Sequence, residues 1–236
     1  MIAGHDKSRG DAHATLYCKF GKRLVDIILA LISVVTFSPI MLIVSVAVFL
    51  DIGLPVIFRQ DRPGLRERPF RLLKFRSMRE NRDEHGIHLP DAARLTRLGR
   101  ILRKTSLDEL PELINVLRGD MSLVGPRPLL LQYLGRYSDE QRRRHEVRPG
   151  ITGLAQVQGR NALLFSQRLA FDVEYVENCS FALDVKILVL TVVKILAFSL
   201  EDRAGQHVSV VDDVGLHPDS PAYRRRSDPP GEGGWS

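Results

Sequence analysis

Cysteine and tryptophan are scarce in this sequence, which contains two cysteines and one tryptophan among 236 residues. Cys18 and Cys179 stand far apart and form no C-x-x-C motif, so the sequence indicates neither a disulfide framework nor a zinc site. A reducing compartment fits this cysteine usage best. The sequence also lacks glycine-rich nucleotide loops of the P-loop and dinucleotide-binding types, and it has no internal repeat. These absences argue against disulfide-rich secreted domains, zinc proteins and repeat proteins.

Acidic residues are fewer than basic ones, 28 against 34, which gives a net charge of +6. This excess favours an anionic partner, either a phosphate-bearing ligand, nucleic acid or an acidic membrane face. No zinc-finger, RRM or other nucleic-acid-binding signature is present, so nucleic acid is not expected as a partner. The length and the hydrophobic fraction of 44% predict one folded domain with appendages.

One long apolar run, from Ile27 to Leu50, contains no charged residue. As a helix its length would be about 36 Å, which is enough for a hydrocarbon core of about 30 Å. Pro39 lies in its middle, removes a backbone donor and clashes with the carbonyl of Val35. The sequence therefore predicts a kink at Ser38-Pro39, where the hydroxyl of Ser38 is available to a freed carbonyl.

Basic residues flank the apolar run on both sides. They are Lys19, Lys22 and Arg23 before it, and Arg59, Arg62, Arg66, Arg68 and Arg71 after it. Lys and Arg are enriched on the cytoplasmic side of membrane helices, so basic flanks at both ends favour a re-entrant helix that enters and leaves by the cytoplasmic face. A plain spanning helix that contains a proline is the main alternative. A signal peptide is disfavoured because the run is too long and polar residues precede it.

The rest of the chain alternates between strand-like and helical patterns. Pro55–Phe58 and Phe70–Phe75, separated by the turn-forming Pro63-Gly64, predict a β-hairpin. Apolar residues at helical spacing predict helices over 95–103 and 110–117. The apolar stretch 187–198 is interrupted by Lys194 and predicts an interfacial helix or a core helix rather than a membrane span.

An acidic cluster, TSLDELPEL, begins at Thr105 in this largely basic chain. A structural explanation is a helix start, because Ser106-x-x-Glu109 matches a capping box, while Asp108 as N-cap would place Pro111 in the donor-free first turn. A functional explanation starts from the same geometry. A carboxylate beside a bound phosphate attacks phosphorus when a metal offsets its charge, and Glu109 is suited to hold Mg²⁺. These residues alone leave both explanations open.

Four segments carry a resemblance to a known family. They are FRQDRPG, FRLLKFRSM, LRKTSLDELPELINVLRGDMSLVGPRPLL and EVRPGITGLAQVQGRN. In order and spacing, from about Lys19 to Phe198, the chain closely resembles the bacterial sugar transferases that act as monotopic phosphoglycosyl transferases. The resemblance implies transfer of a sugar 1-phosphate from a UDP-sugar to undecaprenyl phosphate, with release of UMP. This reaction is the first membrane step in the assembly of a surface glycan or a glycoprotein glycan.

The resemblance also assigns roles to particular residues. Asp108 matches the nucleophile, which forms a phosphosugar-aspartyl intermediate in a ping-pong reaction, and Glu109 matches its acidic partner, which assists Mg²⁺ placement or acid-base chemistry. Arg103 matches a phosphate-binding arginine, and Arg127 matches the arginine of a Pro-Arg-Pro turn near the nucleotide. Arg62, Lys74 and Asp184 match further functionally important charged positions. The family's re-entrant helix matches the bend at Ser38-Pro39.

Where the family pattern has GWAQVNGRN this chain has GLAQVQGRN, so Leu154 and Gln158 depart from it and affect the expected shape of that loop. N-acetylated amino sugars are favoured as the donor sugar, while glucose and galactose stay open. The oligomeric state is also open, with a homodimer as one alternative. A different class of function is a membrane-tethered protein that binds anions without catalysis, for which Asp108 would be dispensable.

The expected fold is α/β (α+β): a helix-rich single domain with a small β-hairpin or sheet, an N-terminal re-entrant membrane helix and interfacial amphipathic helices. The expected organisation is a polar segment 1–18, the membrane helix 19–54 kinked at Ser38-Pro39, a catalytic domain 55–204 and a disordered tail 205–236. The resemblance places the protein at the bacterial inner membrane, with the catalytic domain on the cytoplasmic face.

Overall fold

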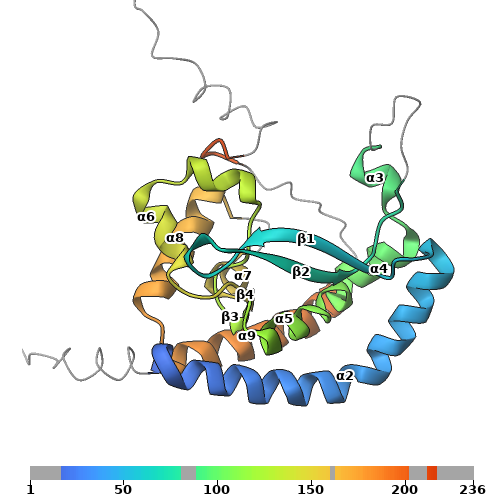
Figure 1. The fold of residues 1–236 in the computed structure, drawn as a ribbon, viewed down its shortest axis with the longest axis horizontal. Helices are drawn as coiled ribbons and strands as arrows, with labels where there is room; N and C mark the ends of the chain where they lie inside the picture. The colour runs from blue at the N-terminus through green and yellow to red at the C-terminus, as the bar shows by residue number, and fades with distance from the viewer. Residues whose placement is uncertain (1–16, 81–88, 160–162, 202–211, 217–236) are drawn as a thin grey trace, which may run out of the picture.

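The computed structural model describes residues 17–80, 89–159, 163–201 and 212–216 of the chain (Figure 1). The strands are β1 (Ile57–Pro63), β2 (Pro69–Phe75), β3 (Ser122–Val124) and β4 (Gly150–Thr152). The helices are α2 (Lys22–Ile52), α3 (Asp91–Arg94), α4 (Arg97–Thr105), α5 (Glu112–Arg118), α6 (Asp139–Arg142), α7 (Leu154–Gln158), α8 (Phe165–Glu177) and α9 (Phe181–Glu201). A π-helical turn spans Tyr17–Gly21, and 3₁₀ turns span Leu65–Glu67, Leu107–Glu109, Leu131–Arg136 and Arg143–His145. The predicted helix-rich fold with a small sheet content is therefore confirmed.

The β1–β2 hairpin crosses the middle of the molecule, and α5 lies between it and α2 (Figure 1). The strands pair antiparallel from Ile57 opposite Phe75 to Pro63 opposite Pro69. The predicted hairpin is confirmed, although its first strand runs further than expected because the ladder continues to Pro63. The sequence did not predict the second sheet, in which β3 and β4 pair in parallel. These strands are three residues each, too short for a periodic signal.

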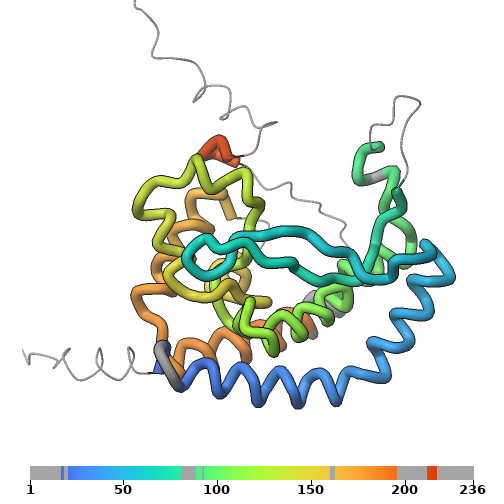
Figure 2. Tube along the Cα trace, in the orientation of Figure 1, coloured from blue at the N-terminus to red at the C-terminus, as the bar shows by residue number. Residues whose placement is uncertain are grey.

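Helix α2 is long and apolar enough to cross a membrane, by length and composition. It runs along one side of the molecule and bends part-way along (Figures 1 and 2). Pro39 lies inside it and accounts for a bend, because proline has no N–H for the carbonyl of Val35. Ser38 Oγ donates to that carbonyl oxygen at 2.8 Å, which confirms the role expected for its hydroxyl.

Both ends of α2 are fixed to the same body. Near its start, Lys22 Nζ lies 2.5 Å from Asp184 Oδ2 on α9, and Arg23 donates to two carbonyls at the end of α5. Near its end, Asp51 pairs with Arg79 at 3.1 Å, and Val48 is fully buried beside the hairpin and α4. Between these attachments the helix exposes a row of large apolar side chains, among them Val35, Leu42, Ile43 and Leu50.

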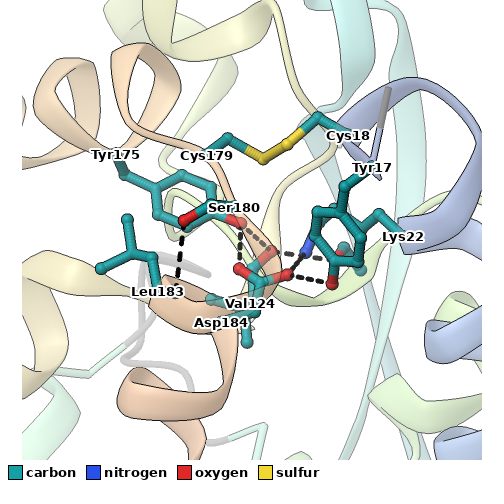
Figure 3. Close-up of a disulfide and its surroundings, with 10 residues drawn as sticks. Tyr17, Cys18, Lys22, Val124, Tyr175, Cys179, Ser180, Leu183 and Asp184 are labelled. Carbon is teal, nitrogen blue, oxygen red and sulfur yellow. Dashed lines mark hydrogen bonds and ion pairs between the residues drawn. A yellow bond between two sulfur atoms is a disulfide. The ribbon is translucent and has the colours of Figure 1, made fainter. Parts of the chain in front are cut away.

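Cys18 and Cys179 form a disulfide bond, with their Cα atoms 6.3 Å apart (Figure 3). The expectation that the cysteines indicate no disulfide is therefore wrong. The turn Tyr17–Gly21 and the connection between α8 and α9 come together in space, and a sequence separation of 161 residues gives no sign of this contact. Two cysteines that are distant along a chain form a bridge wherever folding brings their Cα atoms within about 7 Å.

The chain termini lie largely outside the described residues. Of the expected polar segment 1–18, only Tyr17 and Cys18 are described. Of the expected disordered tail 205–236, residues 212–216 are described, and they do not match that expectation. Leu216 is 1% exposed in a cluster with Tyr133 and Phe165, and Asp213 accepts hydrogen bonds from Ser166.

Candidate active site

Asp108 and Glu109 lie in a tight turn between α4 and α5. Helix α4 ends at Thr105, Ser106 adopts a left-handed conformation with φ of 58°, and the 3₁₀ turn Leu107–Glu109 follows. Non-glycine residues rarely adopt this left-handed conformation. At Ser106 it changes the direction of the chain between α4 and the 3₁₀ turn. Asp108 is 7% exposed, so its carboxylate faces the interior of the site rather than bulk solvent.

The structure tests the helix-start explanation of this acidic cluster. Neither Ser106 nor Pro111, the residues that precede the 3₁₀ turn and α5, makes a side-chain capping hydrogen bond. Asp108 lies inside the 3₁₀ turn and not at the start of α5. Both forms of the capping explanation, the box at Ser106 and Asp108 as N-cap, are therefore wrong. Another reason is needed for a buried carboxylate at this position.

Two cations hold Glu109. Lys74 Nζ of β2 lies 2.7 Å from Glu109 Oε1, and Arg127 Nη2 lies 2.5 Å from the same oxygen. Lys74 also lies 3.0 Å from Glu112 Oε1, so one ammonium group joins two carboxylates. The side chain of Arg127 is 43% exposed, so it lies at the edge of the site and not wholly inside it.

Asn115 aligns the strand that carries Lys74. It is fully buried on α5, accepts from the N–H of Leu73 at 3.0 Å and donates to the carbonyl of Arg71 at 2.8 Å. These two bonds fix β2 against α5 immediately beside Lys74. No sequence pattern indicates a role for Asn115, because a single asparagine on a helix produces none.

Arg103 and Arg62 approach the same region from other elements. At Gly99, α4 comes so close to the preceding loop that an added Cβ would lie 1.9 Å from the carbonyl oxygen of Ser77. One turn later, Arg103 Nε donates to Ser77 Oγ at 3.0 Å. Arg62 of β1 donates to Gln60 and to the carbonyl of Pro128, next to Arg127. Four of the five predicted charged partners, namely Arg62, Lys74, Arg103 and Arg127, therefore lie around Asp108 and Glu109.

The fifth predicted partner, Asp184, lies in a different cluster. It accepts from Tyr175 at 2.6 Å and from Tyr17 at 2.8 Å, and it pairs with Lys22 (Figure 3). This cluster joins the start of α2 to α9 and α8. The structure therefore does not bring Asp184 together with Glu109, Lys74 and Arg127.

The three carboxylates have different pKa values. Burial raises the pKa of Asp108 to about 6, and the charge of Glu109 adds to this rise. Burial also opposes ionisation of Glu109, but Arg127 and Lys74 outweigh it and lower its pKa to about 2. Burial raises the pKa of Glu112 to about 7, although Lys74 opposes this. Carboxylates whose pKa values are pushed apart are typical of sites that divide chemical roles between them.

Comparison with known proteins identifies the family to which the chain belongs. The family model for bacterial sugar transferases matches residues 17–198. The chain belongs to the bacterial sugar transferase family. Within this family, the sugar transferase EpsL of Bacillus subtilis is 55% identical over 175 residues, which cover 74% of this chain and 87% of that protein.

Two other relatives carry names that state a reaction. A UDP-glucose:undecaprenyl-phosphate glucose-1-phosphate transferase of Caulobacter vibrioides is 43% identical over 190 residues, covering 74% of this chain and 69% of that protein. A UDP-N-acetylgalactosamine-undecaprenyl-phosphate N-acetylgalactosaminephosphotransferase of Aeromonas hydrophila is 40% identical over 200 residues, covering 81% and 47% of the two chains. The resemblance inferred from the sequence motifs is confirmed.

Proposed function

We propose that this bacterial sugar transferase moves a sugar 1-phosphate from a UDP-sugar to undecaprenyl phosphate and releases UMP. The observation that carries the proposal is the buried Asp108 carboxylate beside a cluster of cations that includes Lys74, Arg103 and Arg127. Two relatives named for reactions of this type support it. Both substrates carry phosphate, and several cations are needed to bind phosphates and to offset their charge.

Asp108 is the proposed nucleophile. One of its carboxylate oxygens attacks the phosphorus that bears the sugar, the bond from that phosphorus to the bridging oxygen breaks, and UMP leaves with that oxygen. A phosphate oxygen of undecaprenyl phosphate then attacks the same phosphorus, and the bond to Asp108 breaks. Such covalent catalysis lets one site serve a water-soluble and a lipid substrate in turn. Glu109, held ionised by Lys74 and Arg127, fixes the two cations beside the reacting phosphates.

Magnesium is the proposed cofactor. Mg²⁺ takes one or two protein carboxylates and completes its coordination with phosphate oxygens and water. Lys74 and Arg127 both contact Oε1 of Glu109, and the carboxylates of Glu109 and Asp108 would hold the ion. The described residues contain no group of three or more His, Cys, Asp or Glu side chains suited to a metal. This donor set fits an ion that binds together with the substrate phosphates, whose charge it neutralises.

The proposal includes a re-entrant α2 that keeps the catalytic domain on the cytoplasmic face of the inner membrane. A straight helix of 31 residues would separate its ends by roughly 47 Å. Lys22 and Asp51, near the two ends of α2, both pair with residues of one body, and the bend lies between them, which is the arrangement expected of a helix that returns to the face it entered from. Helix α9, which exposes Val185, Val189 and Val192, is the proposed interfacial helix. Homodimer formation stays a prediction.

The proposal is tested by UMP release from the purified protein with undecaprenyl phosphate, Mg²⁺ and a panel of UDP-sugars. With both substrates we expect continuous UMP release for at least one donor. With the UDP-sugar alone, we expect a burst of about one UMP per active site, because the covalent intermediate then accumulates. No release with any donor would contradict the proposal, and release of UDP instead of UMP would show transfer of the sugar without its phosphate.

The rate of this burst should depend on pH through Asp108. The nucleophile must be ionised, and in the metal-free protein burial raises its pKa to about 6, so the rate should rise with pH up to about this value. Bound Mg²⁺ favours the ionised carboxylate, so a higher Mg²⁺ concentration should move the midpoint to lower pH. The measurement is the burst rate between pH 5 and pH 8. The control is Glu112→Gln, because Glu112 is the neighbouring carboxyl with a pKa of about 7. A midpoint near 6 that disappears in Glu112→Gln would assign the titration to Glu112 instead.

A further inference from the structure

The turn Pro126-Arg127-Pro128 is held from outside by three donors, one for each of its carbonyls. The N–H of Gly150 donates to Pro126 at 3.0 Å, Arg144 Nη2 donates to Arg127 at 2.7 Å, and Arg62 Nη1 donates to Pro128 at 3.3 Å. Because proline has no N–H, this turn has one backbone donor of its own and depends on other elements for its position.

Arg144 is the buried side chain among these donors. It is 2% exposed and lies in the 3₁₀ turn Arg143–His145. Its Nε and Nη2 contact Asp172 Oδ2 of α8 at 3.0 and 2.6 Å, and Nη1 donates to the hydroxyl of Tyr137 at 3.2 Å. The planar guanidinium group has donors in fixed directions, so one side chain joins Asp172, Tyr137 and the Arg127 carbonyl rigidly.

A gain in stability does not explain why the Arg144–Asp172 pair is buried. Asp172 is 3% exposed, so both charges have lost nearly all contact with water. Replacement of such a pair by apolar side chains is often neutral or stabilising, because desolvation offsets most of the attraction between the charges. The main contribution of the Arg144–Asp172 pair is therefore to fix the position of the groups that Arg144 binds.

Arg144 holds the backbone of Arg127. The side chain of Arg127 contacts Glu109 at 2.5 Å and is 43% exposed. We propose that Arg144, fixed by Asp172, is a positioning residue that aims Arg127 at Glu109 and at the phosphates of the sugar nucleotide. This inference rests on the proposed function. It assigns to α8, which lies outside the acidic cluster and its cations, a part in donor binding.

The test is a charge-free double variant, Arg144→Met with Asp172→Leu, measured in the UMP assay and by thermal unfolding in detergent. The midpoint of unfolding should stay within a few degrees of the wild-type value. The kcat/KM for the UDP-sugar should fall about tenfold or more, which corresponds to the loss of one charge-assisted hydrogen bond. The kcat/KM for undecaprenyl phosphate should fall less, because in a two-stage reaction it reports the second stage, after UMP has left.

A matched control lies next to this pair. Arg143 in the same turn contacts Glu177 of the same helix α8 at 2.6 Å, but both side chains are exposed and neither touches Arg127. Arg143→Met with Glu177→Leu should leave both kcat/KM values unchanged. If the first double variant does not fold, Arg144→Lys replaces it, since lysine keeps the positive charge but lacks the planar guanidinium group that binds Asp172 through Nε and Nη2 while Nη2 also reaches the Arg127 carbonyl.

The outcomes are distinct. An equal fall in both kcat/KM values, or no fall in either, would overturn the positioning role, because a general loss of folded protein lowers both alike. Failure of the proposed function itself would appear differently, as no UMP release by the wild-type protein in the same assay.

Discussion

Replacement of Asp108 should abolish UMP release while leaving the protein folded. Asp108→Ala removes the proposed nucleophile, and loss of a covalent nucleophile lowers the rate by on the order of 10³-fold or more. The measurement is continuous UMP release with both substrates, together with the burst in the absence of undecaprenyl phosphate. Both signals should fall to background, because neither the first nor the second stage proceeds without this carboxylate.

Asp108→Asn separates this loss from a loss of folding. The pKa of Asp108 is raised by burial, so the folded state favours the protonated form and its stability falls as the pH rises from about 4 to 6. A neutral asparagine of similar shape removes that cost, so the midpoint of unfolding at pH 7 should equal or exceed the wild-type value. UMP release that survives in either variant would show that Asp108 is not the nucleophile. A lowered midpoint in Asp108→Asn would make Asp108 a structural residue.

The second large effect is expected at Asp184, on stability. Asp184→Ala leaves the ammonium group of Lys22 buried without its partner and removes the acceptor of two tyrosine hydroxyls, those of Tyr17 and Tyr175. Breaking one side of a buried ion pair costs about 3–5 kcal/mol. In a chain of this size the midpoint of thermal unfolding should fall by about 10 °C. The measurement is thermal unfolding in detergent, with the KM for the UDP-sugar determined well below the midpoint.

The matched control is Asp61→Ala. Asp61 lies 3.9 Å from Arg71, and both side chains are more than half exposed, so this pair contributes at most about 1 kcal/mol. The loss of the Asp61–Arg71 pair should barely change the midpoint of thermal unfolding. If Asp184→Ala instead keeps its stability and raises the KM for the UDP-sugar, Asp184 serves the donor phosphates as the family resemblance implies. A fall in stability with an unchanged KM would assign it to the attachment of α2.

Local patterns in the sequence were sufficient for several elements of the fold. Proline in an uncharged apolar run predicts the bend of α2, and the Ser38 bond to Val35 follows from the donor that Pro39 lacks. Strand-like runs around Pro63-Gly64 predict the hairpin. Each of these features depends on residues that are neighbours along the chain, which is why the sequence displays them.

Contacts between distant segments were not predictable in the same way. The Cys18–Cys179 bond, the pairing of Arg144 with Asp172 and the alignment of β2 by Asn115 each join elements that only the folded chain brings together. The same limit applies to the acidic cluster, where the residue pattern fitted a helix cap as well as a reactive carboxylate. Only the position of Asp108 within the 3₁₀ turn separates the two explanations.

The Cys18–Cys179 bond also gives the molecule a covalent topology that its linear sequence conceals. It turns the peptide from residue 18 to residue 179 into a closed ring that contains α2, both sheets and every residue of the candidate active site. A protease that cuts this ring once leaves a single molecule of unchanged mass on a non-reducing gel, and the two pieces separate only after a reductant opens the bridge. A cut beyond Cys179 releases the C-terminal piece at once, so paired gels with and without reductant locate each cut inside or outside the ring.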